Sequence, residues 1–185
     1  MKKLAFLALI LPLLISWPTG LVQAATQEEI LKNPEKYPEL EEYKQIFFAN
    51  LRDQNLDWPE KAQKIIDGYK EFIKKYSGNE FADEAKLRIA EMHELSFQKE
   101  KALPYLTDII KNHPQADYFS LTASSSPKIK TAAWALYYRG LWFMHPEAVS
   151  DWERILAEYP ESKEVVGLAK AALAKFKSKF KKQNE

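Results

Sequence analysis

Five positions with fixed spacing recur three times along this sequence, and each set would form an apolar stripe on a helix. The sets are Ile65, Tyr69, Phe72, Ile73 and Tyr76; Ala102, Leu106, Ile109, Ile110 and His113; and Ala148, Trp152, Ile155, Leu156 and Tyr159. Steps of three and four residues place the members of a set on one helical face. A lone amphipathic helix cannot bury such a face, so the pattern requires copies of one unit to stack side by side.

Each recurring helix follows another helical pattern, so the repeating unit is a pair of helices. The most complete unit covers residues 132–160, with an aromatic-rich helix, a break and then the third set. Only five glycines occur in the whole chain, which favours helix. We therefore predict an all-α fold of stacked helix pairs in a single domain over residues 38–181.

Local signals mark several helix ends. Asp57 and Glu60 have the spacing of a capping box, and Gly78 is free to adopt the left-handed conformation that ends a helix. The next helix is expected over residues 80–97, with Phe97 on or near its apolar stripe. Ser126-Pro127 is expected to start the fifth helix.

Residues 115–126 interrupt the helical pattern. The last positions of successive sets lie 37 residues apart between Tyr76 and His113 but 46 apart between His113 and Tyr159, which indicates an insertion of about nine residues. Tyr118 and Phe119 are large for this polar segment. They either pack back onto the neighbouring helices or are offered to a partner.

The first residues have the pattern of a secretory signal peptide. Lys2 and Lys3 precede an apolar run over residues 4–15, which is shorter than the roughly 20 residues needed to span a bilayer. Small residues then stand at the two positions that a signal peptidase reads. We expect a cleaved signal peptide over residues 1–24, a loose lead-in over residues 25–37 and a soluble periplasmic protein.

The composition argues against several chemistries. The sequence contains no cysteine, so we expect neither disulfides, thiolate metal sites or thiol nucleophiles nor the acylated cysteine of bacterial lipoproteins. The formal net charge is +1, and it becomes −1 without Lys2 and Lys3. This balance gives no indication of a nucleic-acid partner.

The histidines and acidic residues do not indicate a catalytic or metal site. Glu91 and His93 are two residues apart, which directs their side chains to different sides of a helix. His113 and His145 precede prolines at helix boundaries, where a turn role is the simpler interpretation. Neither a glycine-rich phosphate loop nor a serine nucleophile elbow is present in the sequence. We expect no catalytic residue, no metal site and no cofactor.

The third unit resembles the tetratricopeptide repeat. Ala148, Trp152 and Pro160 stand at the spacing of that family's second-helix alanine, aromatic residue and closing proline. With Tyr159 and Ser162 added, the pattern resembles the periplasmic repeats of BamD-type outer-membrane assembly lipoproteins and of Tol-Pal-associated proteins. The resemblance covers about residues 60–170 and implies a right-handed superhelix of about seven helices that holds a protein or peptide in its groove. The absent cysteine departs from the lipoprotein members.

Two regions are candidates for contacts with other molecules. The aromatic helix of the third unit is apolar on more than one side, so Trp134, Tyr138 and Arg139 join Tyr118 and Phe119 as candidate partner-binding residues. The basic C-terminal stretch is either the solvated face of a capping helix or a contact for an anionic membrane surface or lipopolysaccharide. Its candidate contacts are Lys175, Lys177, Lys179, Lys181 and Lys182.

These patterns predict an exported, non-catalytic scaffold that binds a protein or peptide in envelope assembly or cell-wall maintenance. One alternative is a helical cell-wall-active enzyme such as a peptidoglycan hydrolase. Another is a protein that binds anionic surfaces through its basic C-terminal helix.

Overall fold

The computed structural model describes residues 33–119, 129–144 and 147–183, so the expected signal peptide lies outside the described residues. Seven α-helices occur within these ranges. They are α2 (Pro38–Arg52), α3 (Trp58–Lys75), α4 (Glu80–Leu95), α5 (Leu103–Asn112), α6 (Thr131–Phe143), α7 (Ala148–Glu158) and α8 (Lys163–Gln183). Two short 3-10 helices, η1 (Pro34–Lys36) and η2 (Lys99–Lys101), precede α2 and α5.

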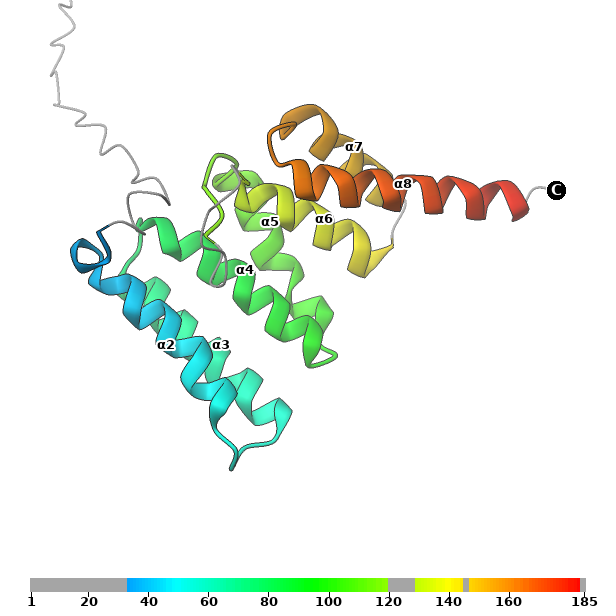
Figure 1. The fold of residues 1–185 in the computed structure, drawn as a ribbon. Helices are drawn as coiled ribbons and strands as arrows, with labels where there is room; N and C mark the ends of the chain where they lie inside the picture. Colours follow the sequence, from blue (N-terminus) through cyan, green and yellow to red (C-terminus); the bar gives the residue numbers. More distant parts are fainter. Residues whose placement is uncertain (1–32, 120–128, 145–146, 184–185) are drawn as a thin grey trace, which may run out of the picture.

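The helices stack as predicted, in consecutive pairs. Helix α2 packs on α3, α4 on α5 and α6 on α7, and α8 covers the C-terminal end (Figure 1). Contacts also join α2 to α4, α4 to α6 and α6 to α8, whereas the described residues show no comparable contacts from α3 to α5 or from α5 to α7. The even-numbered helices therefore form a closer inner layer, and the odd-numbered helices spread apart on the outside. We refer to the surface of the inner layer as the inner face.

The three recurring sets occupy equivalent places in α3, α5 and α7, which confirms the repeat. In every set the first three residues are at most 1% exposed. The last residues, Tyr76, His113 and Tyr159, are the C-caps of their helices, with φ between −119° and −132° and ψ between 40° and 47°. Each of these residues donates its N–H to the carbonyl four residues earlier.

Two clusters of buried side chains meet at α4. The N-terminal cluster joins α2, α3 and one side of α4, and Tyr43, Tyr69 and Phe81 lie at its centre. The C-terminal cluster joins the other side of α4 to α5, α6, α7 and α8 around Trp152. Tyr105 packs against both clusters. Helix α4 is therefore buried on two sides, whereas a surface helix buries a single stripe.

Two of the predicted local signals are confirmed. Asp57 caps α3, because its carboxylate accepts a hydrogen bond of 3.0 Å from the backbone N–H of Glu60. Gly78 lies at φ +92°, in the left-handed region, where α3 gives way to α4.

The expected place of Phe97 is wrong. Helix α4 ends at Leu95, and Phe97 lies at φ +58° with its side chain 96% exposed. This conformation lets the N–H of Gln98 reach the carbonyl of His93 at 2.8 Å, as in a Schellman helix ending. Met144 takes a similar conformation, φ +47°, at the end of α6.

The large exposed apolar side chains gather at one edge of the superhelix. This edge is formed by the turns that follow the even-numbered helices, and we refer to it as the turn edge. Seven of the eight such residues in the described part of the chain lie there: Leu51, Trp58, Leu95, Phe97, Leu103, Leu141 and Met144.

The expected start of the fifth helix is also wrong. Helix α6 begins at Thr131, because the residues before it pair with the end of the segment that follows α5. The N–H of Tyr118 donates to the carbonyl of Ile129, and the N–H of Thr131 donates to the carbonyl of Ala116, both at 2.9 Å. Ser126-Pro127 lies outside the described residues.

Candidate functional site

A row of aromatic side chains runs along α6 and faces α4. Trp134, Tyr138 and Trp142 follow at four-residue intervals, which places them on one side of the helix, and Tyr118 extends the row beyond Trp134. The ring centroids are 5.8 Å apart for Tyr118 and Trp134, 5.4 Å for Trp134 and Tyr138, and 4.6 Å for Tyr138 and Trp142. All four side chains are partly exposed. We refer to these four residues as the aromatic row.

A charged cluster on α4 lies against this row. The Arg88 guanidinium donates hydrogen bonds of 2.7 Å to the carboxylates of Glu84 and Glu91. It also donates to the Tyr118 hydroxyl at 2.9 Å and lies 5.5 Å from the centroid of that ring. Steps of three and four residues hold Arg88, Glu84 and Glu91 together on α4. We refer to these three residues as the Arg88 cluster.

Burial changes the acidity of groups in and beside this cluster. The Glu84 side chain is fully buried, and burial raises the pKa of its carboxyl to about 7, although Arg88 opposes this shift. Burial also raises the pKa of the Tyr138 hydroxyl, and the nearby Glu91 carboxylate adds to the shift. The Tyr118 ring of the aromatic row is therefore held by a hydrogen bond to the Arg88 cluster, and the Tyr138 hydroxyl lies near Glu91 of the same cluster.

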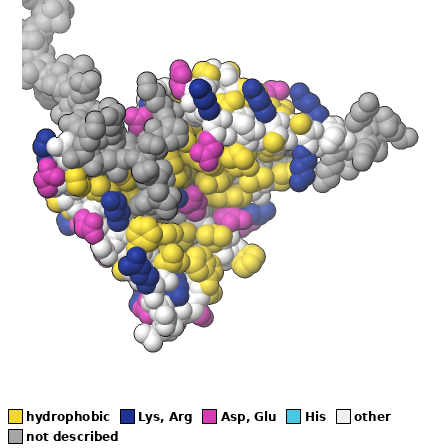
Figure 2. All heavy atoms as spheres, viewed as in Figure 1, with side chains coloured by type: hydrophobic (Ala, Val, Ile, Leu, Met, Phe, Trp, Pro, Cys, Tyr) yellow, Lys and Arg dark blue, Asp and Glu magenta, His cyan; other side chains and the backbone are white. Residues whose placement is uncertain are grey.

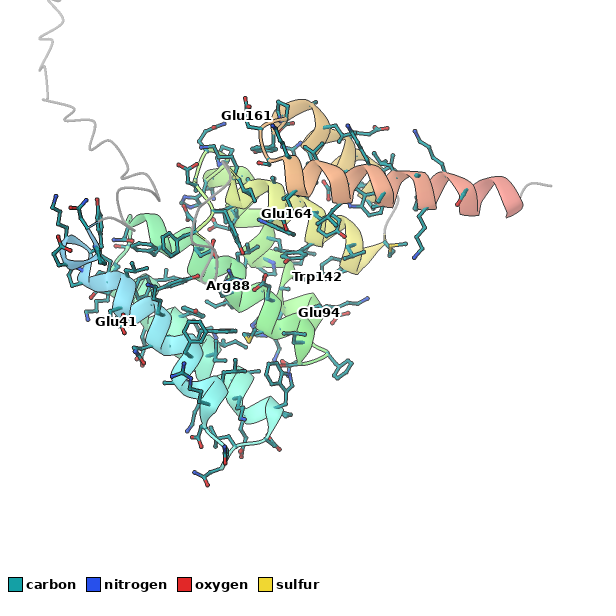
Figure 3. The ribbon with its side chains drawn as sticks, in the orientation of Figure 1. Glu41, Arg88, Glu94, Trp142, Glu161 and Glu164 are labelled. Carbon is teal, nitrogen blue, oxygen red and sulfur yellow. The ribbon has the colours of Figure 1, made fainter. Side chains whose placement is uncertain are left out.

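Two carboxylates near the ends of the row have no side-chain partner among the described residues. They belong to Glu94, in the last turn of α4, and to Glu164, in the first turn of α8. Figure 3 shows Glu94 beside Trp142, and Glu164 on the side of α8 that faces α6. In the same view, Figure 2 shows an apolar band over α6 and α8 with acidic side chains along its border.

Hydrogen bonds fix which carboxylate lies at which end of the row. The Lys99 ammonium, just after α4, donates to the Trp142 carbonyl at 3.2 Å, so the end of α4 lies beside the end of α6. The N–H of Lys130 donates to the Ser162 hydroxyl at 3.1 Å, so the start of α8 lies beside the start of α6. Glu94 therefore lies near the Trp142 end of the row, and Glu164 lies near the Trp134 end.

The structure brings three of the candidate partner-binding residues, Tyr118, Trp134 and Tyr138, together in the aromatic row. It places Phe119 elsewhere, because this side chain is 5% exposed and packs edge-on against Phe81 at 5.3 Å. Phe119 therefore belongs to the N-terminal cluster and is not offered at the surface.

Arg139 is also engaged inside the chain. Its guanidinium pairs with the Asp151 carboxylate, which is 2% exposed, and the Nε atom lies 2.8 Å from the nearer oxygen. Arg139 follows Tyr138 by one residue, so its side chain leaves α6 about 100° around the helix axis from the aromatic row. It joins α6 to α7, and the inner face lies on another side of the helix.

Two of the candidate anionic-surface contacts, Lys175 and Lys177, are exposed and have no ion-pair partner among the described residues. They lie on the part of α8 that extends beyond α6 and α7 (Figure 1). The side chains of the other three lysines, at positions 179, 181 and 182, lie outside the described part of the chain.

Sequence reasoning missed the charged residues of the inner face, namely Arg88, Glu91, Glu94 and Glu164. The four-residue spacing of aromatics on α6 is visible in the sequence, and so is the position of Arg88 between acids on α4. What the sequence does not show is that these sides of α4, α6 and α8 turn toward one another.

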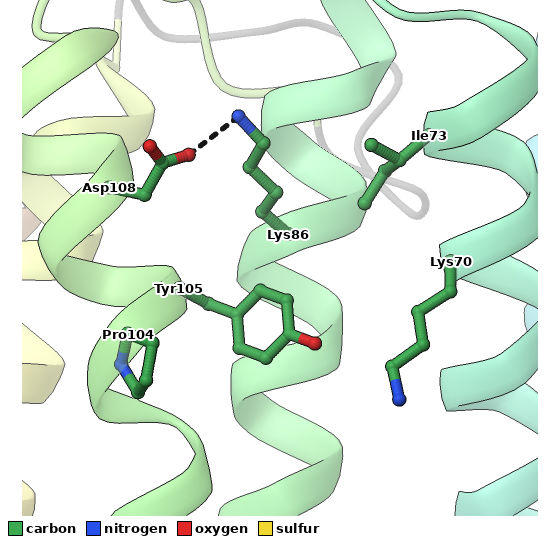
Figure 4. Close-up of a pocket in the computed structure, with 6 residues that line it drawn as sticks. All are labelled: Lys70, Ile73, Lys86, Pro104, Tyr105 and Asp108. Atoms are coloured by element: carbon green, nitrogen blue, oxygen red, sulfur yellow. Dashed lines mark ion pairs between the residues drawn. The ribbon is translucent and has the colours of Figure 1, made fainter.

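The outer face carries an open cavity of about 310 Å³ between α3, α4 and α5 (Figure 4). It is lined by Lys70, Ile73, Lys86, Pro104, Tyr105 and Asp108. The Lys86 ammonium lies 2.7 Å from the Asp108 carboxylate and 2.9 Å from Nε2 of His113. The cavity is mainly apolar and Lys86 is already engaged, so few polar groups converge to orient a small ligand.

The described residues contain no group of three His, Asp or Glu side chains arranged to hold a metal ion. His93 is 6% exposed, and burial lowers the pKa of its imidazole. None of the helices in the described ranges is long and apolar enough to cross a membrane.

The stacked pairs and the inner face define a helical-repeat protein of the kind that binds other proteins. A family model described as "Tetratricopeptide repeat" matches residues 84–116, which cover most of α4 and all of α5. The fold is therefore the predicted tetratricopeptide-like, right-handed superhelix. No curated protein and no solved structure matches this chain.

Proposed function

We propose that this protein is a non-catalytic scaffold that binds an extended segment of a partner protein along the aromatic row. The observation that carries this proposal is a line of partly exposed rings on the inner face, of which the Tyr118 ring is fixed by a hydrogen bond from Arg88. Rings held in place before binding lose little freedom on association, which favours affinity. Superhelical repeat surfaces are extended and suit extended partners.

The site of action in this proposal is the bacterial periplasm, in envelope assembly or cell-wall maintenance. It is supported by the basic start and apolar run of residues 1–24 and by the resemblance of the third unit to BamD-type and Tol-Pal-associated repeats. Determining the N-terminus of the protein recovered from its native cells tests the export step. A chain that still begins at Met1 would contradict export.

Peptide display tests the binding function. A library of random extended peptides is selected on the full protein, and the selected peptides are measured against Trp142→Ala and Trp58→Ala. Trp58 is the matched control because it is a partly exposed tryptophan at the start of α3, at the turn edge, and is not part of the aromatic row. We expect Trp142→Ala to weaken binding at least about tenfold, the loss typical of an aromatic anchor, and Trp58→Ala to leave it unchanged.

Two results would contradict the scaffold function. One is a library that yields no binder, or binders equally insensitive to both tryptophan variants. The other is release of soluble fragments when the protein is incubated with peptidoglycan, because the enzyme alternative predicts release and a scaffold predicts none.

Binding to anionic surfaces is the second candidate function. It is supported by the exposed, unpaired Lys175 and Lys177 on the projecting end of α8. Changing both lysines to Gln should then reduce binding to anionic vesicles at low salt, and unchanged binding would count against this role.

A further inference from the structure

An unpaired carboxylate lies near each end of the part of the aromatic row that belongs to α6. Glu94 lies beside Trp142 (Figure 3), and Glu164 is in the first turn of α8, which lies beside the start of α6, the end of that helix that carries Trp134. The face of an aromatic ring carries partial negative charge and attracts a cation, and a nearby carboxylate strengthens that attraction. Each end of the α6 part of the row therefore combines the two features that favour a cationic side chain.

The chain already uses this chemistry at the Tyr118 end of the row. The guanidinium of Arg88 lies over the Tyr118 ring and between two carboxylates at 2.7 Å. The Arg88 guanidinium neutralises part of the acidic charge of α4. Glu94 and Glu164 have no basic partner among the described side chains.

The length of the row sets the spacing of the cations that it can take. Trp134 and Trp142 are eight residues apart on α6, which corresponds to about 12 Å along the helix. An extended peptide covers about 3.3 Å per residue, so this length corresponds to three or four residues of a partner.

We propose that the inner face selects extended partner segments that carry two basic side chains, three or four residues apart, with apolar residues between them. One basic side chain pairs with Glu94 over Trp142, the other pairs with Glu164 over Trp134, and the apolar residues cover the middle of the row. Arginine is preferred over lysine, because its planar guanidinium stacks on rings and binds carboxylates through two hydrogen bonds. This inference rests on the proposed function and adds the chemistry of the partner.

The same charges disfavour other occupants of this site. An acidic segment would bring like charges next to Glu94 and Glu164, and such contacts oppose binding. An anionic lipid headgroup would meet the same repulsion at this surface. The exposed lysines of α8 are a separate feature of the chain and are not part of this site.

The test compares three end-blocked peptides that differ only at the two basic positions. One peptide carries arginine at both positions, one carries citrulline, which is the neutral isostere of arginine, and one carries glutamate. Binding to the full protein is followed by fluorescence anisotropy. We expect the arginine peptide to bind about tenfold more tightly than the citrulline peptide, and the glutamate peptide to bind most weakly.

The protein variants are Glu94→Gln with Glu164→Gln and, as the matched control, Glu41→Gln on α2, where the carboxylate is exposed. The double variant should reduce the arginine preference to less than about twofold, whereas the control should keep it. Neither carboxylate supports a contact within the described chain, so the melting temperature should be unchanged. Added salt should weaken the arginine preference of the unmodified protein.

The outcomes separate this inference from the function beneath it. Equal binding of the arginine and citrulline peptides, with loss of both in Trp142→Ala, overturns the cation preference and leaves the scaffold function standing. Tightest binding by the glutamate peptide, or an arginine preference that survives in the double variant, also overturns the inference. Absence of any peptide binding, together with a display library that yields no binder, overturns the scaffold function itself.

Discussion

A large apolar residue stands at a position that usually belongs to glycine. Phe97 lies at φ +58° and is 96% exposed, so its ring gains little from burial while its backbone is strained. The left-handed conformation costs a residue with a Cβ atom roughly 1–2 kcal/mol. The hydrogen bond from Gln98 to His93 stabilises the turn in spite of this strain.

Replacing Phe97 should therefore stabilise the fold. We expect Phe97→Gly to raise the free energy of unfolding by about 1 kcal/mol, measured by denaturant titration, because glycine adopts this conformation freely. Leu168→Gly is the control, since Leu168 is also exposed but lies within α8, where glycine should cost about 1 kcal/mol. A loss of stability in both variants would mean that the Phe97 ring contributes contacts to the folded state.

The buried Glu84 carboxyl should make stability depend on pH. Its pKa is about 7 in the folded state and about 4.3 in an unfolded chain, so the folded state binds the proton more tightly. The cost of ionising it in the fold is absent below about pH 4, grows as pH rises and levels off above about pH 7, with a limit of about 3–4 kcal/mol. The unfolding free energy of the native protein should therefore fall relative to that of Glu84→Gln across this range.

Glu42 provides the control with the opposite sign. Hydrogen bonds from Lys75 and Tyr76 lower the pKa of its carboxyl. Its contribution to the free energy of unfolding is therefore present above the pKa of the unfolded chain and is lost as pH falls. Melting curves of Glu84→Gln and Glu42→Gln across pH should diverge from the native protein in opposite directions. Parallel curves for Glu84→Gln and the native protein would contradict a raised pKa of the Glu84 carboxyl in the folded state.

At the level of elements, α6 and α7 approach each other closely at Gly140. A Cβ atom at this position would lie 2.6 Å from Nε1 of Trp152, and that side chain is 1% exposed, so it has little room to move. We expect Gly140→Ala to lower the free energy of unfolding by about 1–3 kcal/mol, measured by thermal or denaturant unfolding.

Gly167 in α8 is the matched control for this change. A Cβ atom there meets nothing within 4 Å, so Gly167→Ala should raise the free energy of unfolding by about 0.5–1 kcal/mol through helix propensity. Stabilisation by both alanine substitutions would show that α6 and α7 can move apart at Gly140 without a loss of stability.

Elements defined by neighbouring residues could be predicted, and elements defined by distant contacts could not. The Asp57 cap and the turn at Gly78 depend on a few adjacent residues, so the sequence was sufficient. The start of α6 depends on pairing of Ile129 and Thr131 with the segment after α5, and no local pattern shows that pairing. The serine and proline at 126–127, whose local signal predicted an earlier helix start, lie outside the described residues.

The candidate site also combines features that local sequence predicts with features that depend on distant contacts. The aromatic row lies mostly on α6, and its four-residue spacing could be seen in the sequence. The Arg88 cluster and the carboxylates of Glu94 and Glu164 come from α4 and α8, so their relation to the row depends on packing of the inner layer. Phe119 was ambiguous because a polar segment carried it, and only its contact with Phe81 places it in the core.

For the whole molecule, protection of backbone amides from hydrogen exchange should be greatest in the middle of the stack. Helix α4 packs into both buried clusters, whereas α8 projects past its neighbours (Figure 1). We expect the amides of α4 to show the slowest hydrogen exchange and those after Phe176 in α8 the fastest, because local opening costs least where few buried contacts break. Equal protection of α4 and the end of α8 would contradict this order.

The turn edge has a consequence for the protein in concentrated solution. Phe97 and Met144 are its most exposed side chains, at 96% and 52%, and they project from successive turns. Attraction between such edges on separate copies depends on apolar contact, so salt screens it little. We therefore expect the turns after α4 and α6 to contribute to self-association of the folded domain in concentrated solution.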